Sequence, residues 1–146
     1  MTDVVVLNGE ALEVALAEVQ AVDAVASDGK YTDLVRQVHD GEVEEVELLE
    51  SVLELGLQSG RIRAVYGPGG EQAALTTLRR LPHGRERGES AAEVTEALQA
   101  LAGRTLDGVR VAAVGPGAFT FTIEAGGVEM LVRLDRSGAR LQSVGT

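Results

Sequence analysis

The stretch VRVAAVGPGAFTFTIEAGGVEMLVRLDRSGARLQSV, residues 109–144, decides the fold. Large apolar residues recur at every second position in FTFTIE, residues 119–124, and again in EMLVRL, residues 129–134. A period of two indicates strands with one buried face. Gly126-Gly127 lies between the two runs and predicts a tight hairpin, because both positions can adopt a positive φ.

The register of this hairpin can be predicted as well as its position. Pairing the strands across the two glycines places every large apolar residue on one face, whereas a slip of one residue would separate them. The resulting partners are Phe119 with Leu134, Phe121 with Val132, and Ile123 with Met130. Residues 115–117 predict a second loop, and Ser137-Gly138 a third turn of two residues. These add the pairs Val109–Ile123, Val111–Phe121, Ala113–Phe119, Leu134–Leu141 and Asp135–Arg140.

The predicted four-stranded antiparallel meander has two unlike faces. We expect the apolar face to be filled core beneath the preceding helix. The other face is mostly polar but includes Val114, Leu131 and Val144. Apolar residues on such a face indicate that something covers it. The protein's own N-terminal helices and a second subunit are the two alternatives.

Residues before the meander divide into a helix and a linker. Ser90-Ala91-Ala92-Glu93 has the pattern of a capping box, and the apolar spacing that follows predicts a helix to about Ala102. Residues 82–89 combine proline, glycine and dense charge, which is typical of a linker. The sequence therefore predicts an α+β protein with an acidic helical region at 1–81, a linker at 82–89, and a helix plus four-stranded antiparallel sheet at 90–146.

Apolar residues in the first region recur at helical spacing. The pattern predicts helices over residues 10–26, 30–39 and 42–59, then a strand or helix extension over 61–66, a glycine-rich turn, and a helix over 71–81. The helix at 42–59 is the most acidic element.

Composition excludes several classes of function. The 146 residues include no Cys, so disulfides, thiolate metal sites and cysteine nucleophiles are excluded. Neither a signal peptide nor an apolar span is evident, and we expect a cytoplasmic protein. The net charge is −10, and residues 1–60 hold 14 of the 23 acidic side chains. This charge repels nucleic acid and favours basic protein surfaces.

The leading hypothesis is a non-catalytic, soluble protein-interaction or assembly subunit of the chaperone, adaptor or immunity-protein type. It would dock a basic protein surface through its acidic helix, or associate with itself by pairing acidic and arginine-rich regions. The expected partner-binding residues are Glu44, Glu47, Glu50, Glu54, Arg79, Arg80, Arg85 and Arg87.

An alternative hypothesis is a small-ligand-binding protein or enzyme. The turn after residues 61–66 precedes a helix N-terminus, and such a junction can bind an anion. The candidate residues are Tyr66, Gly67, Gly69 and Gly70, although their spacing matches neither the dinucleotide fingerprint nor the P-loop. A third hypothesis is nucleic-acid binding by the arginines at 79–87, which predicts strongly salt-dependent retention.

Motifs for catalysis and cofactors are missing from the sequence. The two histidines, His39 and His83, lie outside any nucleophile-elbow or zinc-ligand pattern. The carboxylates of the acidic helix would serve as acid and base only if one of them were buried with a shifted pKa. We therefore expect no cofactor, no metal and no catalytic residue.

Overall fold

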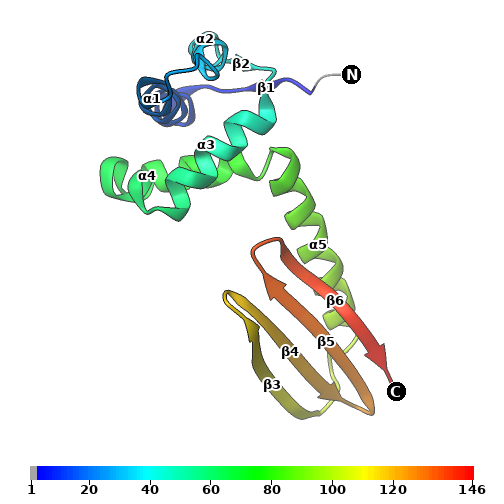
Figure 1. Ribbon diagram of the computed structural model, residues 1–146. Helices are drawn as coiled ribbons and strands as arrows, with labels where there is room; N and C mark the ends of the chain where they lie inside the picture. Colours follow the sequence, from blue (N-terminus) through cyan, green and yellow to red (C-terminus); the bar gives the residue numbers. More distant parts are fainter. Residues whose placement is uncertain (1–2) are drawn as a thin grey trace. The chain divides into compact units, whose positions relative to one another are not determined.

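The computed structural model describes residues 3–146, which form two compact units. The first unit ends at Arg85 and the second begins at Glu86. Helix α5, Pro82–Gln99, begins in the first unit and continues into the second (Figure 1). The unit boundary therefore falls within the residues predicted to form a linker, but these residues are helical.

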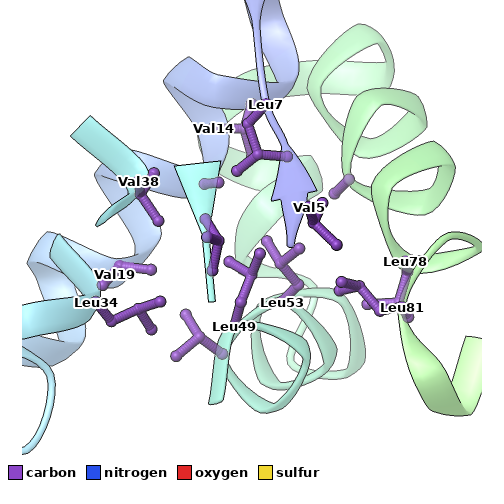
Figure 2. Packing of buried hydrophobic residues seen from close by; sticks show 14 of the residues in the cluster. Val5, Leu7, Val14, Val19, Leu34, Val38, Leu49, Leu53, Leu78 and Leu81 are labelled. Atoms are coloured by element: carbon purple, nitrogen blue, oxygen red, sulfur yellow. The ribbon is translucent and has the colours of Figure 1, made fainter. Parts of the chain in front are cut away.

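The first unit packs helices around one apolar core. Its elements are β1 (Val5–Val6), α1 (Gly9–Val25), α2 (Thr32–Asp40), β2 (Glu42–Val43), α3 (Val46–Gln58) and α4 (Arg61–Leu78). Residues from every one of these elements enter the core, and Leu34, Leu49 and Ile62 are completely buried. Figure 2 shows Val5, Leu49 and Leu53 converging on the centre of this cluster.

One local feature of the first unit differs from the sequence prediction, and a second adopts one of the two alternatives that the sequence left open. Glu42-Val43 is a short strand paired antiparallel with β1, so the acidic helix begins at Val46 rather than at residue 42. Residues 61–66 are helical and belong to α4, which bends at Gly67, where φ is 75°. Pro68 follows in the first turn of the second half of α4, a position that proline favours because no N–H is needed there.

The second unit is the predicted antiparallel meander with a helix packed on it. Its strands are β3 (Leu106–Gly115), β4 (Ala118–Ala125), β5 (Val128–Asp135) and β6 (Gly138–Gly145), in that order across the sheet. The predicted register across Gly126-Gly127 is confirmed by all three pairs, from Phe119–Leu134 to Ile123–Met130. The predicted pairing of β3 with β4 is also confirmed, with Val111 opposite Phe121.

The prediction for the last hairpin was wrong. Leu134 pairs with Ala139 and Asp135 with Gly138, so the turn residues are 136 and 137. An irregularity after Leu131 then places Val144 opposite Met130. Val144 therefore lies on the apolar face and not, as predicted, on the polar face.

Cover of the apolar face by α5 is only partial. Ala97 and Leu98 of α5, and Leu101 just after it, pack on Ile123 and Met130. The rest of this face, which we call the open sheet face, is not the filled core that the sequence predicted. Its side chains are 38 to 59% exposed and comprise Val109, Val111, Phe119, Leu134, Leu141 and Val144.

The capping box predicted at residues 90–93 does not begin a helix, because α5 already begins at Pro82. Ser90 lies inside α5, where its hydroxyl donates a hydrogen bond to the carbonyl of Ala139 on β6. Ser90 therefore attaches α5 to the sheet instead of beginning the helix.

Candidate functional site

A group of exposed carboxylates surrounds the beginning of α3. Glu44, Glu45 and Glu47 are exposed and line a depression of about 730 Å³ together with Asp3. We call these four residues the acidic surface. Lys30, Val46, Leu48, Ser51 and Pro82 complete the lining, so the depression combines negative charge with some apolar wall.

Gln37 of α2 fixes the backbone that presents the acidic surface. Its side-chain oxygen accepts hydrogen bonds from the N–H groups of Glu44 and Glu45 at 2.9 and 3.0 Å. Its amide nitrogen donates to Oε2 of Glu45 at 3.4 Å. These bonds satisfy N–H groups of the loop between β2 and α3 and hold its adjacent carboxylates in place.

Glu50, which the sequence assigned to the partner-binding surface, lies elsewhere. Its side chain is 1% exposed, and its two carboxylate oxygens accept the N–H groups of His83 and Gly84 at 3.2 and 3.1 Å. Nδ1 of His83 lies 2.9 Å from Oε1. Glu50 thus caps the N-terminus of α5, where a negative charge is stabilised by the helix dipole.

Glu54, one turn after Glu50, is half-buried. One ligand atom from each of Glu50, Glu54 and His83 could bind a metal ion, since these atoms lie within 4.8 Å of one another. The capping hydrogen bonds already account for the position of Glu50, so this group has a structural explanation without an ion.

The four arginines assigned to a basic patch have different surroundings. Arg80 donates from Nη1 to the carbonyl of Val6 at 3.1 Å, and Arg85 donates from Nη2 to Asp3 at 3.0 Å. Arg79 is exposed. Arg87 belongs to the second unit, where its side chain lies against Gly138. The Arg85–Asp3 pair is exposed at both ends and contributes at most about 1 kcal/mol.

The alternative ligand site at Tyr66–Gly70 is a bend within α4. The helix that begins at Pro68 does present its N-terminus, but the carboxylate of Glu10 lies beside it. A Cβ added to Gly69 would be only 3.2 Å from Oε1 of Glu10. The protein therefore supplies its own carboxylate where the hypothesis placed an external anion.

A polar cluster that the sequence analysis missed lies at the interface of α1, α3 and α4. Glu18 is 2% exposed and accepts hydrogen bonds from Nε of Arg61 at 3.0 and 3.2 Å. The hydroxyl of Tyr66 donates to Oε1 of Glu18 at 2.9 Å. Burial, followed by the hydrogen bond and charge of Glu18, raises the pKa of Tyr66. The hydrogen bond and charge of Glu18 raise the pKa of Arg61.

Gly56 of α3 makes room for this cluster. A Cβ at this position would lie 2.7 Å from Cδ1 of Ile62 and 2.9 Å from Oε2 of Glu18. One signal in the sequence points to the cluster. Gly56 is an isolated glycine within a helix, which indicates a close approach.

Comparison with protein-family models, curated proteins and solved structures finds no match to this chain. Among the helices of residues 3–146, none is both long and apolar enough to cross a membrane.

Proposed function

We propose that this protein is a non-catalytic interaction or assembly subunit that docks a basic protein surface. The observation that supports this proposal best is the acidic surface, where Glu44, Glu45, Glu47 and Asp3 surround a single depression. The first unit contains 15 acidic and seven basic side chains, a net charge of −8, so its wider field has the same sign.

This charge distribution would help the protein to select and meet its partner. It would not by itself give tight binding. Exposed ion pairs contribute about 0–1 kcal/mol each, whereas a field of one sign raises the rate of encounter and repels partners of like charge. Val46 and Leu48 in the wall of the depression would supply apolar contact once a lysine or arginine of the partner is in place. The same field disfavours nucleic acid as the partner.

The open sheet face supports the assembly part of the proposal. Exposed apolar patches of this kind usually mark a protein–protein interface. A second copy of the chain is the occupant that we propose, and it would bury Phe119 and Leu134 from each copy. Docking of a basic partner and self-association use different residues, so one subunit can do both. A reducing, cytoplasmic location suits a chain without Cys.

The docking proposal is tested by affinity purification from the native host at low and high salt. We expect a stoichiometric partner with a basic surface that is lost at high salt. Replacement of Glu44, Glu45 and Glu47 by Gln should release that partner at low salt. The matched control replaces the exposed α5 residues Glu89, Glu93 and Glu96 by Gln, which removes the same charge from another surface.

Two outcomes would contradict docking through the acidic surface. Recovery of the chain without a partner at both salt concentrations is the first. Equal loss of the partner from both triple variants is the second, because it would mean that total charge matters and the acidic surface does not.

A further inference from the structure

A cavity of about 520 Å³ opens beside the Glu18–Arg61–Tyr66 cluster, in the first unit. Its walls come mainly from the last turns of α1 and from α3 and are mostly apolar. They include Ala21, Val22, Val25, Ala26, Tyr31, Val52, Leu55 and Gly56. A smaller hollow of about 350 Å³ shares Val22, Tyr31, Val52 and Leu55 with it and extends along α3. This size is within the usual range for small-molecule sites.

The polar groups of this cavity gather around one charged pair. Glu18 and Arg61 both line the cavity. Ser59, which is close to Arg61 in the sequence, also lines it. Both oxygens of Glu18 already accept hydrogen bonds from Arg61 or Tyr66, and its charge is paired with that of Arg61. Arg61 can still bind a ligand. It donates to Glu18 from Nε, and its side chain is 49% exposed. Both hydrogen bonds between Arg61 and Glu18 come from Nε, and none comes from Nη1 or Nη2.

The apolar walls include side chains that remain largely exposed to water. Val25 is 87% exposed and Leu55 is 60% exposed, although both line the cavity. Burial of these two side chains by a ligand would be favourable, because it removes apolar surface from water. The cavity thus offers apolar contact along its wall and hydrogen-bond donors at Arg61.

We propose that this cavity binds a small amphipathic molecule with an apolar tail and an acidic head, such as a medium-chain carboxylic acid. The head would accept hydrogen bonds from Nη1 and Nη2 of Arg61, since a guanidinium has only donors and its fork matches a carboxylate. The tail would lie along Val22, Val25 and Leu55. The site is separate from the acidic surface, so this proposal does not depend on the docking function.

The character of Arg61 sets the specificity for the head. A cationic head would meet the guanidinium, and Glu18, the carboxylate that lines this cavity, is already paired with Arg61. A carboxylate head gains two parallel hydrogen bonds, and Arg61 would then bridge it to Glu18. An amine of equal chain length is therefore the discriminating competitor, since it keeps the tail and reverses the charge.

Octanoate and octylamine are suitable probes for titration of the full-length chain, with binding followed by NMR of methyl groups. Octanoate should give saturable shifts at the methyl groups of Val22, Val25 and Leu55, and octylamine should give none. Replacement of Val25 and Leu55 by Gln should weaken octanoate binding about tenfold or more. These side chains are exposed, so the fold should tolerate the change. Val65→Gln, at a position 58% exposed on α4, is the matched control and should bind normally.

Arg61→Lys tests the head separately from the tail. Lysine keeps the positive charge beside Glu18 but loses the fork, so octanoate binding should weaken about tenfold while the circular dichroism spectrum stays native. No saturable octanoate shifts would overturn the site. Equal binding of octylamine would overturn the assignment of the head. Unchanged octanoate affinity in the Val25 and Leu55 double variant would overturn the placement of the tail.

Discussion

Glu50 accepts the backbone N–H of Gly84 at 3.1 Å, although 34 residues separate the two in the sequence. The same carboxylate accepts the N–H of His83, so a buried side chain of α3 satisfies two of the donors at the N-terminus of α5. This contact explains why a segment containing proline, two glycines and many charges is helical.

Replacement of Glu50 by Ala should therefore destabilise the first unit. Two partly buried N–H groups at the N-terminus of α5 would lose their acceptor, which costs about 1–3 kcal/mol for each unsatisfied group. We expect the free energy of unfolding in urea to fall by at least about 2 kcal/mol. Glu47→Ala removes an exposed carboxylate from the same helix and should change it by less than about 0.5 kcal/mol. Equal effects of the two substitutions would mean that Glu50 does not cap α5.

A second prediction concerns the approach of α1 to α3 at Gly56. The Cβ of Gly56→Ala would meet Ile62 and Glu18 at under 3.0 Å, so the side chains must shift. Overpacking of this kind typically costs about 1–3 kcal/mol. Gly88 of α5 is the control, because an added Cβ there meets nothing within 4 Å. Gly88→Ala should stabilise the protein by up to about 1 kcal/mol through helix propensity. Thermal or urea unfolding of both variants measures the contrast.

The meander could be predicted because its signals are local. Gly126-Gly127 and the alternating runs on either side agree on one register, and the structure has that register. The prediction of the last hairpin was wrong for a local reason that the spacing of apolar residues does not reveal. Asp135 accepts the N–H of Ser137 at 2.9 Å, which fixes the turn one residue earlier than Ser137-Gly138. The irregularity after Leu131 then changes the face of Val144.

The features that were missed depend on distant partners. Pro82–Glu89 has the composition of a linker, yet Glu50, which is distant in the sequence, accepts N–H groups of its first helical turn. The Glu18 cluster likewise joins residues 43 and 48 positions apart. Helical periodicity assigns carboxylates to the solvent side by default, so a buried glutamate with distant partners is the kind of residue that such a pattern cannot place.

A third prediction follows from the raised pKa of Tyr66. Because its folded-state pKa lies above the ordinary value of 10.0, the contribution of Tyr66 to stability is complete below pH 10 and is lost as the pH rises through the folded-state pKa. The ultraviolet absorbance of tyrosinate should rise in a step above pH 10 that Tyr66→Phe removes and Tyr31→Phe retains. A Tyr66 step at or below pH 10 would contradict burial of its hydroxyl beside Glu18.

The fourth prediction concerns the open sheet face. Phe119 and Leu134 pair across β4 and β5 and are 43 and 41% exposed, so together they present adjacent apolar surface. If a second copy covers this face, sedimentation velocity should show concentration-dependent association, and replacement of both residues by Gln should weaken it about tenfold or more. Sodium chloride should change this association little, and sulfate should strengthen it, because burial of apolar surface drives it. Val65→Gln, which removes an exposed apolar side chain from α4, should leave the association intact. A chain that stays monomeric at every concentration, or an association abolished by sodium chloride alone, would contradict self-association through this face.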